Sequence, residues 1–348
     1  MKKFRIYLPV LLALILIAPF LNGCLFGKKT ETPAINDNSN IIIGFSIHGL
    51  DMPRWKKEKA MAEEFALEKG FNLLITDAQK DPEKQIEQCK NLIYQGVKAL
   101  IIIPEDDESA GKIAEIAKEN NVPLIAYDRI VRNAYLPYYV NFNQVKVGEL
   151  QAKILTEKYP KGNYVQLKGS PTDFNTTYFT EGNAKILDKY IESGDIKLIA
   201  SEYVPGWYRN EAYKIMKNIL KERTDIAAVL VQNDNMGSAV IQALEESGLA
   251  GKVGVTGQDA DLDSIKYILQ GKQTMTVYKP LKIMNTVALN FALELAKGGT
   301  PKTNGFSENG YMKVPTYFID VIPVTKDNID ETVIKDGFYT REQVYGES

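Results

Sequence analysis

Short apolar runs alternate with amphipathic segments along the chain from residue 41 onward. An unbroken run of β-branched and aliphatic residues, as at 41–47 and 99–103, is typical of a strand that is buried on both faces of a parallel sheet. Between such runs the apolar residues recur at helical spacing, as in 54–69, a segment that ends at Gly70. This alternation predicts an α/β protein built from strand–helix–strand units.

The predicted elements fall into two halves. The pattern predicts strands at 41–47, 73–75, 99–103, 124–127, 164–167, 196–201, 229–231, 253–255, 275–278 and 317–322. It predicts helices at 54–69, from 83 up to Gly96, and at 109–120, 145–159, 178–193, 209–222 and 282–297. The first half makes consecutive strand–helix–strand steps, which predict a doubly wound open sheet, and the alternation restarts after Asn143.

The late helix at 282–297 and the last strand fit neither half alone, so we expect the chain to cross between two lobes more than once. The expected first lobe comprises residues 41–143 and 280–313, the second comprises 144–279 and 314–340, and 341–348 form a tail. Multiple crossings form a hinge, and a cleft between two hinged lobes suits closure on a ligand.

Four of the apolar runs stop abruptly at charged or amide side chains. The side chains that follow these runs are Asp128 and Arg129, Asn233 and Asp234, Gln258 and Asp259, and Lys279. The carboxyl ends of parallel strands are where open α/β sheets bind ligands. Arg, Asp, Asn, Gln and Lys provide paired hydrogen-bond donors and acceptors, which suit a polyhydroxylated molecule that is bound without being transformed. The sequence therefore predicts a binding cleft.

The chain has two tryptophans, and both stand beside turns. Trp55 lies at the first strand-to-helix junction, and Trp207 follows the pair Pro205-Gly206. Flat aromatic rings suit the C–H faces of a sugar ring, although core packing is the alternative for each. Arg54 and Arg129 both follow strand ends, where a planar guanidinium matches adjacent hydroxyls; a surface salt bridge is the alternative.

Other polar residues near the strand ends have more than one interpretation. Lys279 could hold a hydroxyl or pair with Asp259. Asp261 and Asp263 are interpreted as helix-start charges that the helix dipole stabilises. His48, at the end of the first strand, is ambiguous.

Composition and motifs argue against catalysis and against nucleic acid as a partner. The 348 residues are 45% hydrophobic and 25% charged, as in ordinary globular proteins, and the net charge of -2 carries no long run of one sign. Two cysteines exclude a disulfide scaffold, and a single histidine excludes a multi-histidine metal site. The sequence contains no nucleophile elbow, phosphate loop or dinucleotide-binding run. We expect neither an enzyme nor a cofactor.

The N-terminus has the composition of an export signal. A positive leader precedes the apolar stretch 7–21, which is short for a membrane span and runs into Leu21-Asn22-Gly23-Cys24. This pattern predicts a lipoprotein signal at 1–23 that is cleaved before Cys24, which would then carry the lipid; an uncleaved anchor is the alternative. With either a cleaved signal or an uncleaved anchor, the body of the protein is expected to lie outside the cytoplasm. Residues 24–40 are expected to form a flexible tether.

Several motifs of the chain match one group of known proteins. The motifs are Tyr127-Asp128-Arg129, the heptapeptide 147–153, Gly169-Ser170-Pro171, and the segments 257–261 and 274–280. They resemble the D-xylose-binding branch of the ribose/galactose-type periplasmic binding proteins, which serve ABC transporters, and the resemblance extends from about residue 41 to 338. It implies the type I periplasmic-binding-protein fold, with two doubly wound parallel-sheet lobes joined by a three-crossover hinge.

The resemblance also implies a set of sugar contacts and a function. With Asp128 from the strand ends, the candidate site comprises Arg54, Trp55, Asp128, Arg129, Asp173, Asn175, Trp207, Asn233, Asp259 and Lys279. Asp234 and Gln258 become supports of these residues. The expected function is capture of D-xylose, or a closely related aldopentose, and delivery to an ABC permease. The alternative is a xylose-sensing co-receptor that presents its closed form to a membrane histidine kinase.

Overall fold

The computed structural model describes residues 38–346 of the chain. The expected signal at 1–23, Cys24 and most of the expected tether lie outside the described residues. Within residues 38–346, no helix is both long enough and apolar enough to cross a membrane.

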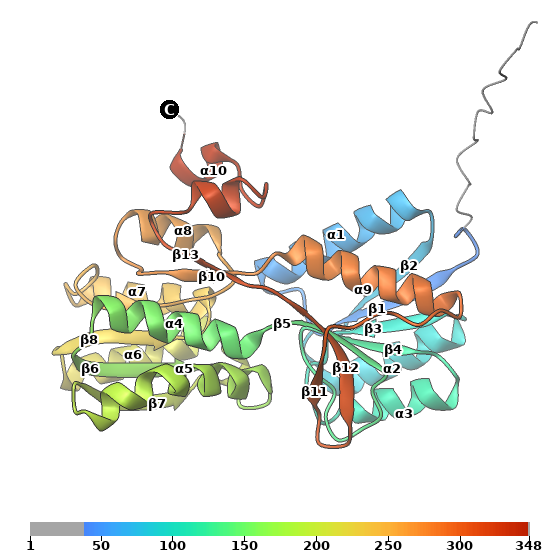
Figure 1. Cartoon of the computed structure of the whole chain (residues 1–348), viewed down its shortest axis with the longest axis horizontal. Helices are drawn as coiled ribbons and strands as arrows, with labels where there is room; N and C mark the ends of the chain where they lie inside the picture. The colour runs from blue at the N-terminus through green and yellow to red at the C-terminus, as the bar shows by residue number, and fades with distance from the viewer. Residues whose placement is uncertain (1–37, 347–348) are drawn as a thin grey trace, which may run out of the picture. The chain divides into compact units, whose positions relative to one another are not determined.

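The first lobe is built on a seven-stranded sheet (Figure 1). Its strands, in the order β11-β12-β5-β4-β3-β1-β2, are Gly305–Glu308, Lys313–Ile319, Tyr138–Phe142, Leu124–Tyr127, Ala99–Ile102, Ile42–Ile47 and Asn72–Asp77. All neighbours pair in parallel except β11 and β12, which form an antiparallel pair. Helices α1 (Pro53–Lys69) and α9 (Leu281–Ala296) bury their apolar residues against one face, and α2 (Pro82–Tyr94) and α3 (Gly111–Glu119) cover the other. The expected doubly wound sheet is confirmed.

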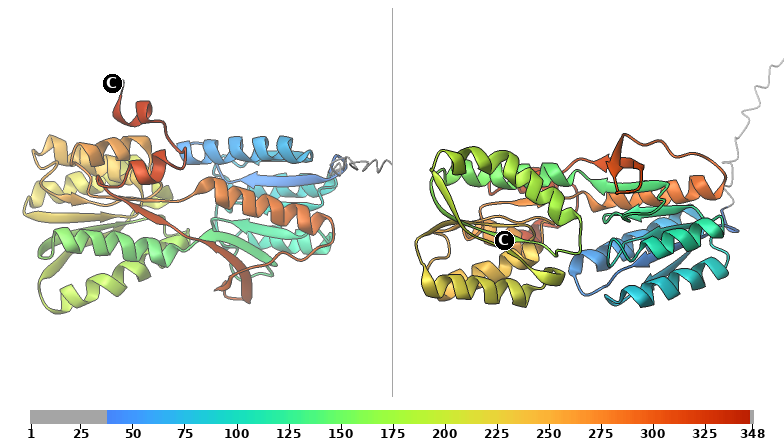
Figure 2. Two further views of the ribbon diagram at one scale, coloured as in Figure 1. Left: turned by 45° about the horizontal axis from the view of Figure 1, so that its top comes forward. Right: turned by 90° about the horizontal axis from the view of Figure 1, so that it is seen from below.

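The second lobe contains a four-stranded parallel sheet in the order β7-β6-β8-β9. These strands are Ile196–Tyr203, Gly162–Lys168, Ile226–Val231 and Gly254–Val255. Helices α4 (Gln144–Lys158) and α5 (Asn175–Glu192) lie on one side, and α6 (Arg209–Glu222) and α7 (Asp234–Glu246) lie on the other (Figure 2). The remaining elements are the 3-10 turn Pro205–Trp207, α8 (Leu262–Leu269), β10 (Thr276–Tyr278), β13 (Ile322–Val324), the turn Asp330–Ile334 and α10 (Arg341–Tyr345).

Within the described residues, the chain passes between the two lobes three times. It crosses at Asn143 between β5 and α4, at Pro280 between β10 and α9, and at residues 320–321 between β12 and β13. Because β12 pairs with β5 in the first sheet, the third crossing follows Ile319 and not residue 313, where we expected the lobe boundary.

Two predicted strands differ from the structure. The strand predicted at 317–322 is wrong, because β12 ends at Ile319 and β13 begins at Ile322, on opposite sides of a crossing. The apolar run that ends at Tyr278 is not part of a parallel sheet; β10 pairs antiparallel with β13 in a separate two-stranded sheet. A short apolar run shows that a segment is buried but not which neighbour it pairs with.

Candidate functional site

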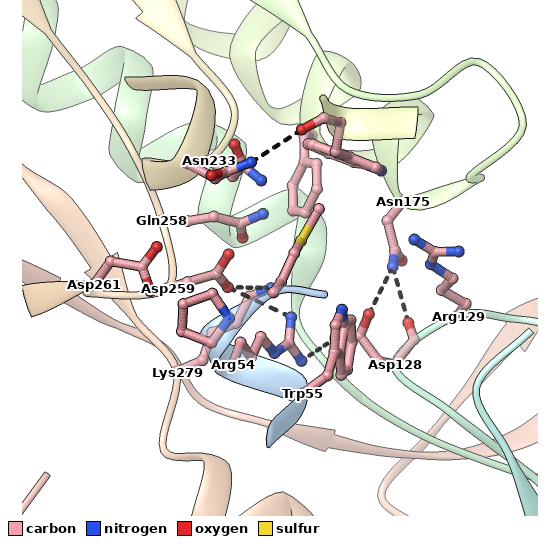
Figure 3. Close-up of a pocket in the computed structure, with 15 residues that line it drawn as sticks. Arg54, Trp55, Asp128, Arg129, Asn175, Asn233, Gln258, Asp259, Asp261 and Lys279 are labelled. Atoms are coloured by element: carbon pink, nitrogen blue, oxygen red, sulfur yellow. Dashed lines mark hydrogen bonds and ion pairs between the residues drawn. The ribbon is translucent and has the colours of Figure 1, made fainter. Parts of the chain in front are cut away.

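A pocket lies where the two lobes meet (Figure 3). The residues that line it are Met52, Pro53, Arg54, Trp55, Asp128, Arg129, Asn175, Phe179, Trp207, Asn233, Asn235, Gln258, Asp259, Asp261 and Lys279. They follow the carboxyl ends of β1 and β4 in the first lobe and of β6, β7, β8, β9 and β10 in the second. The structure therefore brings nine of the ten predicted site residues together around one pocket, all but Asp173.

Arg54 lies in a ring of carboxylates. Its Nε donates to Glu58 Oε1 at 3.0 Å, its Nη2 to Asp128, and its Nη1 to Asp259 Oδ1 at 3.4 Å. Burial lowers the pKa of Arg54, but Asp128 and Glu58 outweigh this effect, and the net pKa is raised. The guanidinium is thus held as a cation at the junction of the lobes.

The Asp259 carboxylate forms ion pairs with two cationic side chains. Besides Arg54 from the first lobe, Lys279 Nζ lies 3.3 Å from Asp259 Oδ1. This contact realises the pairing that the sequence left open for Lys279, and both residues also line the pocket. The backbone of Asp259 is left-handed, with φ of 93°, as is that of Asp128, with φ of 64°. Such backbone is uncommon outside glycine and concentrates at functional sites.

Arg129 lines the pocket and also links the two lobes. Its Nε lies 3.0 Å from Asp173 Oδ2, and its Nη1 donates to the carbonyl oxygens of Pro104 and Glu105 at 3.0 Å each. Asp173 does not line the pocket; its Oδ2 also accepts from Trp207 Nε1 at 3.1 Å. Burial raises the pKa of Asp173 although Arg129 opposes the shift. Asp173 thus acts on the pocket by holding Arg129 and Trp207.

The two tryptophans line the pocket and belong to the core as well. Trp55 and Trp207 are 4% and 5% exposed and take part in the hydrophobic clusters of their lobes. Trp207 packs so closely on Gly169 that a Cβ there would lie 2.0 Å from its ring. The Arg54 guanidinium lies 4.3 Å from the Trp55 ring centroid. Each tryptophan therefore packs in the core of its lobe and also lines the pocket. From the sequence alone, core packing is an alternative to a sugar-facing position.

Two amides position their side chains by binding backbone. Asn175 Nδ2 donates to the carbonyl oxygen of Asp128 at 2.9 Å and so joins the second lobe to the first. Asn233 is the N-cap of α7, and its Oδ1 accepts from the Met236 backbone N–H at 2.9 Å. Because the cap uses the oxygen, the NH₂ group of Asn233 stays available as a donor.

His48 is a support of the pocket wall. It is fully buried, its Nδ1 lies 2.8 Å from Glu105 Oε2, and its ring meets Trp55 edge-on at 4.9 Å. Burial and the charge of Arg129 lower its pKa well below the usual value, so the ring is neutral. Its place behind Trp55 resolves the ambiguity in the sequence.

The lining contains residues that sequence reasoning missed or assigned elsewhere. Phe179 was missed because it lies inside the helix predicted at 178–193, where an apolar residue is expected to pack in the core. Gln258, expected as a support, lines the pocket, and its buried Oε1 has no partner among the described residues. Asp261 both precedes α8 and lines the pocket; burial and Asp259 raise its pKa to about 7. The sequence did offer one indication that Asp261 lines the pocket, because it lies two residues after Asp259.

The expected support role fits Asp234. This buried carboxylate accepts from Gln273 Nε2 at 2.9 Å, from Thr276 Oγ1 at 2.8 Å and from the Asp261 backbone N–H at 2.8 Å. It ties the loop after β9 to the strand that leads to Lys279. Among the described residues, no group of three or more His, Cys, Asp or Glu side chains could hold a metal ion.

Comparison with known proteins identifies the family. Residues 43–300 match the family described as "Periplasmic binding protein domain". The chain belongs to the periplasmic binding protein family. This membership confirms the expected type I fold of two α/β lobes.

Two D-xylose-binding periplasmic proteins are similar in sequence to this chain over most of its length. It is 40% identical over 322 residues to the D-xylose-binding periplasmic protein of Haemophilus influenzae, an alignment that covers 92% of this chain and 97% of the relative. It is also 40% identical to the Escherichia coli protein of the same name, over 87% of this chain and 92% of that protein. These identities confirm the resemblance found in the motifs.

A solved relative has the same fold. The carbohydrate transporter solute-binding protein of Chloroflexus aurantiacus, solved in complex with D-glucose, superposes with a TM-score of 0.82 at 28% identity. The superposition covers 86% of this chain and 97% of that one.

Proposed function

We propose that this periplasmic binding protein captures D-xylose, or a closely related aldopentose, outside the cytoplasm and delivers it to an ABC permease. One observation carries the proposal: the pocket of Figure 3 gathers charged donors, carboxylates, amides and two tryptophans from both lobes. The names of the two relatives at 40% identity supply the choice of xylose.

The chemistry of the lining suits a pyranose. Arg54, Lys279 and Asn233 offer donors, and Asp128 and Asp259 offer acceptors, which together match the paired hydroxyls of a sugar ring. The tryptophans provide flat apolar walls for the C–H faces. Two buried polar atoms of the lining, Trp55 Nε1 and Gln258 Oε1, are a donor and an acceptor without a partner among the described residues, and a polar ligand would satisfy both.

Binding would work by stabilising the closed arrangement of the lobes. A sugar that touches Arg54 and Asp128 of the first lobe and Asn233 and Lys279 of the second interacts with both only when the lobes are together. Its differential affinity therefore shifts the population toward the closed form.

The proposal includes membrane anchoring through a lipid on Cys24, which would keep the protein near its permease. The expected result is that the full chain fractionates with membranes, whereas a Cys24→Ala chain does not. Presentation of the sugar-bound closed form to a membrane histidine kinase would use the same pocket; a kinase gene beside this one, in place of ATPase and permease genes, would favour that partner.

Calorimetric titration of the purified body, residues 38–348, tests the sugar assignment. We expect saturable binding of D-xylose at one site per chain, with weaker binding of D-ribose, L-arabinose and D-glucose. Equal or tighter binding of a hexose would contradict the choice of xylose. No heat with any sugar of the panel, at protein that is shown to be folded, would contradict sugar binding.

Tryptophan fluorescence tests whether xylose reaches the wall formed by Trp207. In a Trp55→Phe background Trp207 is the single tryptophan, and we expect its emission to change in intensity or wavelength as xylose saturates the site. The reciprocal variant Trp207→Phe reports on Trp55 in the same way. A flat Trp207 response, at xylose concentrations that calorimetry shows to be saturating, would remove Trp207 from the contact surface.

A further inference from the structure

A buried carboxyl group lies beneath Arg54 and outside the pocket lining. Glu58 is on α1, one helical turn after Arg54, and its side chain has no exposed surface. Its Oε1 accepts from Arg54 Nε at 3.0 Å, and its Oε2 accepts from the hydroxyl of Tyr127. A buried charge is costly unless it is paired and hydrogen-bonded, so this group needs a role that justifies its place.

The contacts of Arg54 show what that role is. Two of the three guanidinium nitrogens are taken by carboxylates of its own lobe, Nε by Glu58 and Nη2 by Asp128. A guanidinium is planar and rigid, so fixing two nitrogens fixes the direction of the third. The third, Nη1, points to Asp259 across the pocket.

Glu58 itself is held firmly in place. Its backbone oxygen accepts from Asn285 Nδ2 of α9 at 3.1 Å, which anchors this turn of α1 to the neighbouring helix. Tyr127, its other side-chain partner, is fully buried at the end of β4. These contacts fix the orientation in which the Glu58 carboxylate accepts from Arg54.

We propose that Glu58 is a positioning residue for sugar binding, whose carboxylate fixes the Arg54 guanidinium in the orientation that it presents to the ligand. This inference rests on the proposed function. Without Glu58, Nε loses its acceptor, and Asp128 is the one acceptor among the described residues of the first lobe that still holds the guanidinium, beside the longer contact of Nη1 with Asp259. The affinity for the sugar falls because the ligand must then order the side chain itself.

The protonation of Glu58 gives the proposal a specific signature. Burial raises the pKa of Glu58 to about 7; Arg54 opposes the rise, and Asp128 adds to it. The charged groups that face this carboxyl from the surrounding elements are Arg54 on α1, Asp128 after β4, Asp259 after β9 and Lys279 after β10, with the titratable Tyr127 on β4. Ionised Glu58 accepts a charge-assisted hydrogen bond from Arg54 and another from Tyr127. The protonated acid can donate to the Tyr127 hydroxyl instead, but it then holds the Arg54 guanidinium with a neutral oxygen, which is a weaker acceptor. Affinity should therefore rise as the pH rises through about 7, and sugar binding should lower the pKa of Glu58.

The test is a pH series of calorimetric titrations with D-xylose. For the wild-type protein we expect affinity to rise several-fold from about pH 6 to about pH 8. Glu58→Gln keeps the size of the side chain but cannot ionise, so we expect affinity about tenfold weaker at about pH 8 and the loss of that part of the pH dependence. The readout is the difference between the two profiles, because Asp261 also has a pKa of about 7 and contributes to both.

A matched control tests whether the effect depends on the buried position of Glu58 or on the loss of any carboxylate from α1. Glu64→Gln makes the same chemical change on the exposed side of α1 and should reproduce the wild-type profile. Tyr127→Phe supplies a second test, because it removes a donor to the Glu58 carboxylate and should move the rise in affinity to higher pH.

The outcomes distinguish the two proposals. If wild-type protein binds xylose and folded Glu58→Gln shows the same affinity and the same pH profile, the positioning role is wrong and the proposed function stands. If Glu58→Gln does not fold, an unchanged profile in Tyr127→Phe has the same meaning. If folded wild-type protein binds no sugar at any pH, the proposed function fails and this inference fails with it.

Discussion

Asp259→Ala is expected to abolish measurable D-xylose binding while the protein stays folded. The carboxylate holds Arg54 Nη1 at 3.4 Å and Lys279 Nζ at 3.3 Å, one cation from each side of the pocket. Its removal deletes an acceptor for the sugar and leaves two cations in the pocket without their shared partner. Truncating one member of a buried charge pair at a binding interface costs about 2–5 kcal/mol, which corresponds to a loss of affinity of at least about 30-fold.

Calorimetry with D-xylose measures this loss, and Asp263→Ala is the matched control. Asp263 is an exposed aspartate four residues further along, in the first turn of α8, and does not line the pocket. We expect the control to bind as the wild type does. Asp259→Ala protein that binds xylose within about threefold of wild type would refute a direct role for Asp259.

Arg129→Ala is expected to abolish xylose binding and to lower stability as well. The guanidinium pairs with buried Asp173 at 3.0 Å and satisfies two backbone carbonyl oxygens of the first lobe. Burial already raises the pKa of Asp173 against the effect of Arg129, so the carboxylate has no comparable partner once the arginine is gone. Breaking a buried ion pair by removing one member costs about 3–5 kcal/mol.

Urea unfolding of the ligand-free protein measures the stability, and calorimetry measures the binding. The control is Arg223→Ala, which breaks an exposed pair with Asp225 at 2.6 Å and should change the free energy of unfolding by less than about 1 kcal/mol. A mutant Arg129→Ala that unfolds at the wild-type urea concentration would show that the pair contributes no net stability. Retention of wild-type xylose affinity would show that Arg129 is dispensable to the pocket.

The strand ends could be predicted from the sequence because burial and polarity change abruptly there. Local patterning alone shows where apolar runs stop before Asp128, Asn233 and Asp259, and such stops mark the carboxyl ends of the strands in each sheet. The partners of these residues could not be found in this way. Asp173 lies in the loop after β6 and Asn175 opens α5, several residues beyond the end of the apolar run, and both came only from the family resemblance.

The burial of Glu58 could not be predicted from the sequence either. In the sequence it is one of many charged residues on an amphipathic helix, and nothing local marks it as buried. Its environment is made by Tyr127 of β4 and Asn285 of α9, residues that are far from it along the chain. The lobe boundary after Ile319 was out of reach for the same reason, since strand pairing is a property of two distant segments.

The three crossings of the chain have a consequence for how the protein is made. The first lobe takes β12 and helix α9 from the last quarter of the chain, and α9 buries Met284 and Leu289 in the same core as Phe45 and Ile101. An N-terminal fragment that ends before α9 lacks part of that core, so the first lobe cannot be completed before most of the second lobe has been synthesised. Native pairing of such distant segments is slow, because a long loop must close before its contacts form. The first lobe therefore stays incomplete until α9 and β12 have been made, and the second lobe until β13 has followed.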